Sequence, residues 1–245
     1  MRSAKYIQLL AALILVFGFA TATEAADMNK ETTLDARQQA IVTIAAFTTS
    51  GDMQRLKPAL NQGLDAGLTV NEVKEVLVQM YAYAGFPRSL GGIGAFMGVL
   101  DERKAKGIRD EEGKDASPVP PDFDRDAYGA RVRADLSGLK EVPTTLAPYQ
   151  QFAPIIDSFL KEHLFADIFV RDILTHQERE LATIACLANL GGVEGPLRFH
   201  LGAAMNTGLS EGQMHDFIRV LDASVGKEQA ASAGEALSEV LAGRG

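Results

Sequence analysis

The chain has 245 residues, of which 47% are hydrophobic and 23% are charged, and its formal net charge is −8. This composition excludes wholesale disorder, and the acidic charge gives no electrostatic basis for binding nucleic acid, which requires concentrated lysine and arginine. The length suits one large domain or two small ones.

The first 26 residues are predicted to be a secretory signal peptide. Arg2 and Lys5 precede an apolar run over residues 7–20, and small residues follow it, so cleavage fits best after Ala22, with Ala25 the next choice. An uncleaved N-terminal anchor is the alternative, although the run is too short for a comfortable membrane span. We therefore expect a periplasmic or secreted protein that does not contact the membrane once the signal is removed.

The first half of the exported chain is predicted to be helical. Its opening helix is apolar nearly all round, which places it at the centre of the fold, and Thr33 or Asp35 can cap its start. Gly67 stops the second helix, and a capping box at residues 69–72 opens the third. Helices are expected over residues 36–49, 53–66 and 70–84, and from the turn at residues 85–87 to about residue 104.

Residues 107–128 are charged first and then Pro-rich, with almost nothing to bury, and they predict a linker. We place an acidic, Pro-rich linker at 107–147, between a first repeat at 27–106 and a second at 148–245. Helices are expected over residues 148–163, 176–190, 194–206, 211–223 and 227–241. Because no stretch shows sustained period-two alternation bounded by turns, the prediction is an all-α fold.

The two halves of the chain share a sequence pattern, offset by about 140 residues. Residues 40–45 in the first half match residues 181–185 in the second, and residues 67–69 match residues 208–210. The chain therefore reads as two repeats of one helical unit, and only the second repeat has a histidine in its second helix, His200.

The residues of these repeats resemble the carboxymuconolactone decarboxylase family. The resemblance covers most of residues 34–242, apart from the linker and its flanks. It implies two alkylhydroperoxidase D-like helical bundles in tandem, and a homo-oligomer formed as a trimer of two-repeat chains. The matching residues are 67–69, 72–79 and 83–87 in the first half, and 165–169, 179–185, 197–201, Asn206, Gly208 and Leu209 in the second.

The family's chemistry falls into two classes. One is the decarboxylation of γ-carboxymuconolactone, in which loss of carbon dioxide leaves an enolate that must be protonated at carbon. The other is thiol peroxidase chemistry, which uses a Cys-x-x-Cys pair shortly before a histidine. This chain has Val193-Glu194-Gly195-Pro196 there, and its single cysteine, Cys186, is predicted to be a small buried residue in mid-helix. A peroxidase acting between chains through Cys186 would need that thiol exposed with a lowered pKa.

His200 is the main candidate for catalysis. It lies at the edge of the apolar stripe of its helix, where an imidazole can exchange a proton with a bound substrate; the alternative is a core-edge histidine bonded to a backbone carbonyl. By resemblance, the family has a functional histidine here and an acid at Glu180, which would fix the imidazole tautomer. A first-turn glutamate is also favoured by the helix dipole alone. Arg171 and Arg179 could neutralise a substrate carboxylate, but both also suit solvent.

Each repeat keeps residues that the other lacks. Aligning Leu56 with Leu197 puts Ala59 opposite His200, and it also puts an alanine of the first repeat near Glu180. The first repeat has therefore lost the polar pair. The first repeat has in turn an aromatic turn at residues 83–87 that the second repeat does not share.

These differences predict one composite pocket per chain. Tyr83, Phe86 and Pro87 of the first repeat would help to wall the catalytic pair, and Glu194 would contact the substrate. The alternatives are drift in a duplicated scaffold and, for Glu194, a first-turn acid with no further role.

The sequence thus favours a cofactor-free lyase that acts on a small carboxylated or lactone-like molecule, by decarboxylation or by lactone or isomerisation chemistry. His163, His176 and His215 show no pairing at metal-ligand spacing, so no metal is expected. The alternative is a non-catalytic exported binding or assembly protein on the same scaffold. An enzyme should hold His200 and Glu180 together in a concave, partly apolar cavity, whereas a scaffold protein should pack His200 shut.

Overall fold

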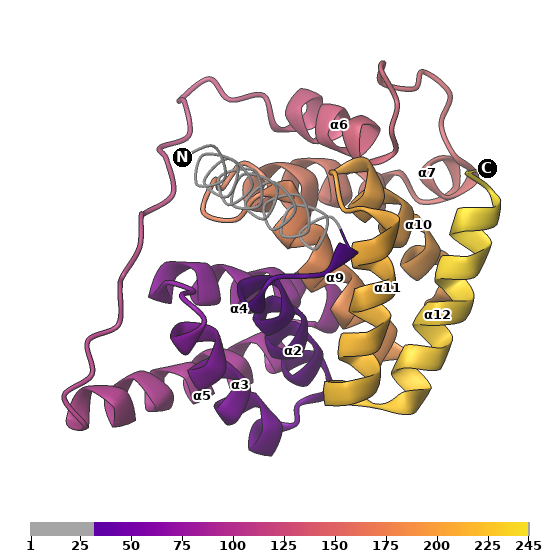
Figure 1. The fold of residues 1–245 in the computed structure, drawn as a ribbon. Helices are drawn as coiled ribbons and strands as arrows, with labels where there is room; N and C mark the ends of the chain where they lie inside the picture. The colour runs from indigo at the N-terminus through magenta and orange to yellow at the C-terminus, as the bar shows by residue number, and fades with distance from the viewer. Residues whose placement is uncertain (1–31, 245) are drawn as a thin grey trace, which may run out of the picture.

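The computed structural model describes residues 32–244, which form helices joined by turns and loops, with no β-strand among them (Figure 1). This confirms the predicted all-α fold. The predicted signal peptide lies outside the described residues. The helices are α2 (Ala36–Ser50), α3 (Met53–Asp65), α4 (Val70–Ala84), α5 (Phe86–Ala105), α6 (Arg125–Leu136), α7 (Pro148–Phe152), α8 (Pro154–Ser158), the π-helix η1 (Phe159–Ile168), α9 (His176–Leu190), α10 (Glu194–Asn206), α11 (Glu211–Val220), the π-helix η2 (Leu221–Val225) and α12 (Lys227–Ala242).

Helices α2 and α9 pack against each other at the centre of the molecule (Figure 1). Ile41 and Ile44 on α2, and Leu181 and Ile184 on α9, are completely buried. Burying each such side chain stabilises the fold by roughly 1.5–3 kcal/mol. Because α2 belongs to the first repeat and α9 to the second, the two repeats share one continuous hydrophobic core.

The helix ends follow the predicted capping signals. Asp35, rather than Thr33, caps α2 by accepting a hydrogen bond from a backbone amide in the first turn. Capping boxes form at residues 69–72 and 175–178, where they open α4 and α9. Gly67 follows α3 with a φ of 91°, a conformation that L side chains rarely adopt. Local sequence therefore sets where these helices begin and end.

The segment at 107–147, predicted to be a linker, contains the helix α6. This helix packs along η1 and buries Val132 and Leu136. The two backbones approach closely at Gly129, where a Cβ atom would lie 1.9 Å from the carbonyl oxygen of Lys161. The helix is thus a packed part of the fold, held where only glycine fits.

The stretch before α6 runs along the start of α4. The amides of Val70 and Asn71 donate to the carbonyls of Glu111 and Glu112, each over 2.9 Å. Lys74 adds an ion pair with Glu112 at 2.7 Å. These hydrogen bonds satisfy first-turn amides that have no partner within the helix, and they fix the connection to the first repeat.

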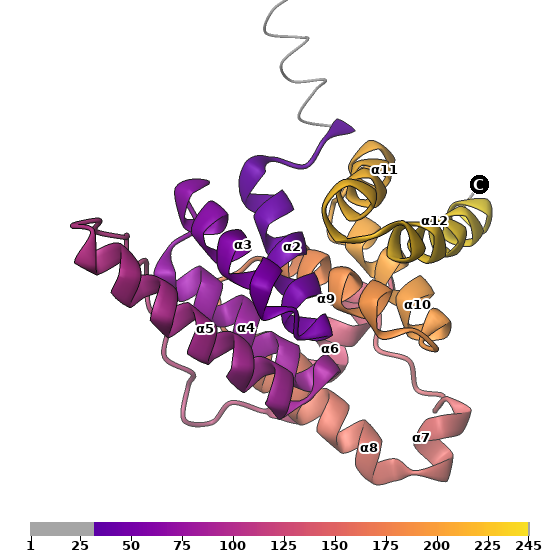
Figure 2. The same cartoon turned by 90° about the horizontal axis from the view of Figure 1, so that it is seen from below.

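The prediction of one continuous helix over residues 148–163 is wrong, because this stretch forms α7, α8 and the start of η1. Pro154 separates α7 from α8, because proline lacks the amide that a continuing helix requires, and α8 then runs into the π-helix η1. In Figure 2, α7 and α8 form an arm at the edge of the molecule. Phe152 and Ile155 on this arm are 92% and 63% exposed. The helix predicted at 211–223 likewise ends in a π-helical turn, η2.

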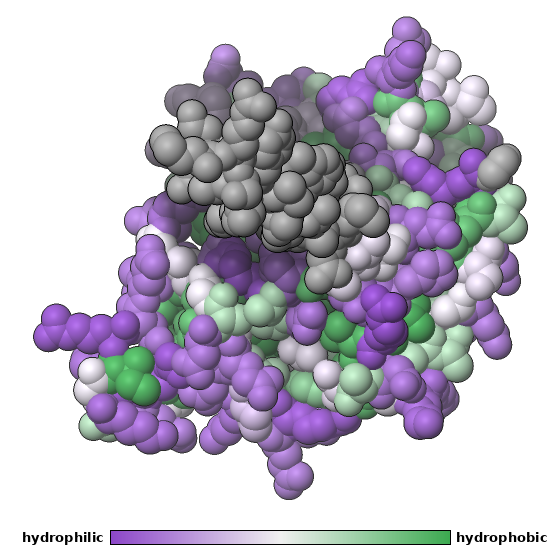
Figure 3. Space-filling model, viewed as in Figure 1, coloured by the Kyte–Doolittle hydropathy of each residue, from purple (hydrophilic) through white to green (hydrophobic). Residues whose placement is uncertain are grey.

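The described surface is polar over most of the face shown in Figure 3, with apolar residues interspersed. Scattered apolar side chains of this kind are normal on folded proteins. Among residues 32–244, no helix combines the length and the apolar character needed to cross a membrane.

Candidate active site

The two predicted catalytic side chains meet between α9 and α10. Gly191 and Gly192, with φ values of 60° and 70°, turn the chain so that α10 packs back against α9. This brings Nδ1 of His200 to 2.8 Å from Oε2 of Glu180. Glu180 is completely buried and His200 is 6% exposed. The hydrogen bond is therefore shielded from water. In such a buried environment, a hydrogen bond to a charged group is stronger than it is in water.

This hydrogen bond determines which nitrogen of His200 is available. An ionised carboxylate only accepts hydrogen bonds, so Nδ1 carries a proton and Nε2 is left to accept or deliver one. Nε2 makes no hydrogen bond with residues 32–244. The second carboxylate oxygen of Glu180, Oε1, is buried and has no hydrogen-bond partner in that range. Among the described residues, the imidazole of His200 is therefore the one hydrogen-bond partner of the Glu180 carboxylate.

Tyr83 of the first repeat completes the surroundings of the imidazole. Its ring meets His200 edge-on with centroids 5.6 Å apart, and Phe199 does so at 5.0 Å. Burial, and next the negative charge of Glu180, raise the pKa of Tyr83 well above its usual range, so its phenol stays protonated. The hydroxyl lies beside Thr183 without meeting hydrogen-bond geometry, and it has no partner among the described residues.

His200 and Tyr83 line a cavity of about 830 Å³. Pockets that hold small molecules measure roughly 300–1,000 Å³, so this one is large. Helices α6, α7, η1 and α10 supply most of its walls, which are mainly apolar. The other lining residues are Ala82, Asp126, Ala130, Arg133, Ala134, Ser137, Leu139, Val142, Pro143, Thr145, Leu146, Ala147, Tyr149, Gln150, Asp157, Leu160, Lys161, Leu164, Phe165, Gly195, Pro196 and Phe199.

A network of charged side chains forms the polar part of the wall. Arg133 and Gln150 both donate to Oδ1 of Asp157, over 2.6 and 2.7 Å. Lys161 pairs with Asp157 at 3.5 Å and with Asp126. Burial opposes the charge of Asp157, yet the hydrogen bonds from Arg133 and Gln150 outweigh it and hold the pKa of this carboxyl below its usual value. The wall therefore pairs two basic side chains, Arg133 and Lys161, with two acidic ones, Asp126 and Asp157.

Three predicted substrate-binding residues lie away from the cavity. Glu194 is exposed and accepts a hydrogen bond of 3.1 Å from the amide of Gly192. Phe86 is 63% exposed and stacks on Tyr81 with centroids 4.6 Å apart. Pro87 is exposed in the first turn of α5. None of the three lines the cavity, so of the predicted substrate-binding residues the structure brings only Tyr83 to the pair.

Sequence reasoning missed Arg133, Asp157 and Lys161. Arg133 lies on α6, inside the predicted linker, and the other two lie on α8 and η1, after the unforeseen helix break at Pro154. A weak signal was present, because Tyr128, Val132 and Leu136 recur at fourfold spacing in an otherwise charged stretch. Such a stripe marks the buried side of a helix and would have placed Arg133 next to it.

Arg171 and Arg179 join helices and do not line the cavity. Arg179 is completely buried and lies 3.3 Å from Glu75 on α4, while Arg171 reaches the same carboxylate at 2.8 Å. Gln79 donates to the carbonyl of Arg179 and accepts from its guanidinium, each over 2.9 Å. Burial lowers the pKa of Arg179. This network ties α4 of the first repeat to α9 of the second, next to Glu180.

The single cysteine is inaccessible. Cys186 is completely buried, and burial raises the pKa of its thiol to about 11. A reactive thiol needs the opposite environment, with exposure and a lowered pKa. Within residues 32–244 there is also no group of three or more His, Cys, Asp or Glu side chains that could hold a metal ion.

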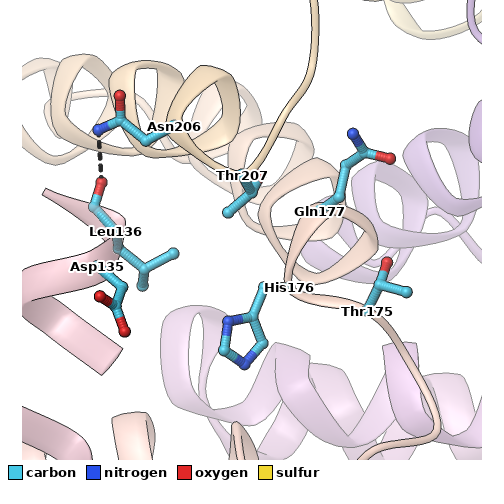
Figure 4. A pocket seen from close by; sticks show the side chains of 7 residues that line it. All are labelled: Asp135, Leu136, Thr175, His176, Gln177, Asn206 and Thr207. Atoms are coloured by element: carbon cyan, nitrogen blue, oxygen red, sulfur yellow. Dashed lines mark hydrogen bonds between the residues drawn. The ribbon is translucent and has the colours of Figure 1, made fainter. Parts of the chain in front are cut away.

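A second, smaller hollow of about 430 Å³ lies between the end of α6 and the start of α9 (Figure 4). His176 and Asp135 line it, and Asn206 donates to the carbonyl of Leu136 at its rim over 2.8 Å. Burial lowers the pKa of His176. Neither His200 nor Glu180 lines this hollow, so it is separate from the candidate site.

Comparison with known proteins gives the same two halves. The Carboxymuconolactone decarboxylase family matches residues 15–96 and 154–239, and the first match begins within the predicted signal peptide. A 4-carboxymuconolactone decarboxylase of Acinetobacter baylyi is 31% identical over 97 residues, which cover 40% of this chain and 72% of the relative. An uncharacterized protein of Methanocaldococcus jannaschii is 29% identical over 70 residues, which cover 29% of this chain and 65% of the relative. With matches over more than half of its length, this chain belongs to the carboxymuconolactone decarboxylase family and contains two tandem copies of the family's unit.

Proposed function

We propose that this protein is a cofactor-free enzyme that moves a proton to or from a carbon atom of a carboxylated or lactone-like substrate. The observation that carries the proposal is the 2.8 Å hydrogen bond between buried Glu180 and a histidine that lines a cavity. A buried carboxylate with one partner is costly for a fold, so its retention beside a cavity supports a chemical role. The name of the Acinetobacter relative supports a decarboxylation.

In a decarboxylation the bond between the substrate carbon and its carboxylate breaks. Carbon dioxide leaves, and the electron pair stays on the substrate as an enolate. His200, protonated on both nitrogens, then delivers the Nε2 proton to carbon and becomes neutral. Glu180 keeps Nδ1–H in place throughout and balances the positive charge of the imidazolium before transfer. A proton from solvent restores the starting state.

The same pair can also support isomerisation or lactone chemistry. Neutral His200 would take a proton from one carbon at Nε2 and return it to another, with no net change in the enzyme. Proton transfer by a positioned side chain typically accelerates a reaction about 10²- to 10⁴-fold. The proposal therefore predicts a loss of that size when the imidazole is removed.

The test is a screen of the purified protein against β-keto acids and unsaturated lactones, including 4-carboxymuconolactone. Wild type should turn over at least one compound. His200→Ala should lower that activity by about 10²- to 10⁴-fold. Glu180→Gln should lower it less, because an amide oxygen can still accept a hydrogen bond from Nδ1–H. Glu178→Gln, on the same helix, is the matched control and should keep full activity because glutamine preserves the capping box. Equal turnover by wild type and His200→Ala would contradict the proposal.

We also propose export and self-association. The signal peptide predicted from Arg2, Lys5 and the apolar run supports export. Exposed apolar residues such as Phe152 and Ile155 support a homo-oligomer, formed as a trimer of two-repeat chains, that would cover them. Fractionation of cells with N-terminal sequencing tests the first, and light scattering of the purified protein tests the second. An intact N-terminus in the cytoplasm, or a monomeric mass, would contradict them.

A further inference from the structure

More than half of the residues lining the cavity come from a part of the chain outside both family matches. The matches end at residue 96 and resume at residue 154, and the intervening stretch supplies α6, the loop 137–147 and α7 to the wall. His200 and Tyr83 lie within the matched parts. Glu180 and His200 therefore belong to the shared family unit, while more than half of the lining residues lie outside it.

The loop 137–147 presents apolar side chains that the fold leaves uncovered. Leu139, Val142 and Leu146 are 45%, 42% and 51% exposed, although all three line the cavity. The helix η1 contributes Leu160 and Leu164 to the same cavity. Apolar side chains from two separate elements in one large cavity match a ligand with an apolar body, which would remove these side chains from water.

Arg133, in the polar part of this wall, has N–H groups that make no hydrogen bond with the described residues. Its Nη1 donates to Asp157 at 2.6 Å and to Tyr149 at 3.4 Å, whereas Nε and Nη2 donate to none of residues 32–244. Lys161, by contrast, is shared between two aspartates. A guanidinium with free donors binds a carboxylate through two parallel hydrogen bonds.

We propose that the site takes an amphipathic monocarboxylic acid with an alkyl or aryl body of roughly eight or more carbons, a size suited to pockets of this class. The carboxylate binds Arg133, and the body lies between the loop 137–147 and η1. This inference rests on the proposed function, since it names the substrate class of that same site. A compact dicarboxylic acid would leave the apolar side chains of the loop and of η1 in contact with water, so their burial would add little to its binding free energy.

The experiment is a calorimetric titration of the full protein with hexanoate, octanoate and decanoate, with hexanedioate as the compact diacid. Each added methylene that becomes buried should strengthen binding about fourfold, and hexanedioate should bind more weakly than decanoate. Affinity that does not change along the series, or tighter binding of hexanedioate, would overturn the inference. Titration needs no turnover, so the result is independent of whether His200 proves catalytic.

Two variant pairs locate the ligand. Ala130→Phe narrows the cavity from α6 and should weaken decanoate much more than hexanoate, while Ala127→Phe, on the exposed side of the same helix, should bind like wild type. Arg133→Gln should weaken all three acids by a similar factor. Arg125→Gln, which removes an exposed ion pair on the same helix outside the cavity, should not. Val142→Trp narrows the cavity from the loop 137–147 and should also weaken decanoate more than hexanoate. Because residue 142 is not in a helix, the larger side chain does not disturb one. Equal effects of the cavity variants and their controls would overturn the placement.

Discussion

The two repeats carry different residues at matching positions of one helical unit. In the second repeat, Glu180 and His200 form a buried hydrogen bond of 2.8 Å. In the first, the corresponding places hold Ala40 and Ala59, which are 7% and 2% exposed. The first repeat shows that the bundle packs well with two small apolar side chains there. The polar pair is therefore an addition to the fold, and its presence needs a reason other than packing.

The first repeat still takes part in the site. Tyr83, at the end of α4, places its ring against His200, and Gln79 on the same helix holds the backbone of α9 just before Glu180. One copy thus carries the proposed reactive groups, and the other packs against them. Duplication within one chain allows this division, because the two copies change independently while they share a core.

Making the second repeat resemble the first should have the largest effect. His200→Ala should lower turnover about 10²- to 10⁴-fold and should also destabilise the protein, because a buried carboxylate that loses its only partner costs about 3–5 kcal/mol. Changing Glu180 to alanine as well should recover much of that stability and none of the activity. Urea denaturation of the single and double variants measures this. A double variant less stable than His200→Ala would contradict it.

Removing Glu75 tests the connection between the repeats. Glu75→Ala leaves the fully buried Arg179 with Gln79 and a backbone carbonyl, and breaking a buried pair in this way should lower the free energy of unfolding by about 3–5 kcal/mol. Lys74→Ala on the same helix breaks an exposed pair and should cost less than about 1 kcal/mol. Similar losses for the two variants, measured by denaturation, would show that this network does not join the repeats.

Tyr83→Phe tests whether the hydroxyl of this first-repeat residue contributes to activity. Removing a buried hydroxyl that has no hydrogen bond should leave stability unchanged or raise it by up to about 1 kcal/mol. Activity should fall severalfold, because the ring of Tyr83 packs against the imidazole of His200 and its phenol is close enough to Glu180 to feel the charge of the carboxylate. Tyr81→Phe is the matched control, since its hydroxyl is also buried without a partner but does not line the cavity. Kinetics and thermal melts of both variants test this, and equal activities would argue against the composite pocket.

The smallest expected effect is on pH dependence. The pKa of Asp157 lies below its ordinary value of 3.8, because hydrogen bonds from Arg133 and Gln150 outweigh the effect of burial. A lowered pKa in the folded state contributes stability that is present above the unfolded value and is lost as the pH falls through the folded one. Asp157→Asn should therefore flatten the stability profile below about pH 4 and leave its shape near neutrality unchanged. An identical acid limb in the two proteins would contradict this.

Sequence was most informative where a local rule acts. The capping box at residues 69–72 predicted the start of α4, and the apolar character of α2 on nearly all sides predicted its central place. The pairing of Glu180 with His200 was implied by the resemblance to the family, and the turn at Gly191 and Gly192 lets α10 pack back against α9 so that the two side chains meet. In each of these cases the deciding residues lie close together in the chain.

Sequence was least informative where tertiary contacts decide. The helix α6 is so highly charged that only the spacing of Tyr128, Val132 and Leu136 marked its buried side, and its partner η1 follows only after α7 and α8. Phe86 follows Tyr83 closely, yet it stacks on Tyr81 outside the cavity, because the direction of a side chain after a turn depends on what it packs against. The polar wall around Arg133 could not be foreseen without that helix.

The central claim is that the imidazole of His200 transfers a proton at carbon with the help of Glu180. The most direct measurement is the rate of product formation in deuterium oxide, followed by mass spectrometry, for wild type and His200→Ala with a substrate found in the screen. Wild type should place one deuterium on the reacting carbon, and the variant should do so about 10²- to 10⁴-fold more slowly. Formation of the same labelled product at the wild-type rate by His200→Ala would contradict it.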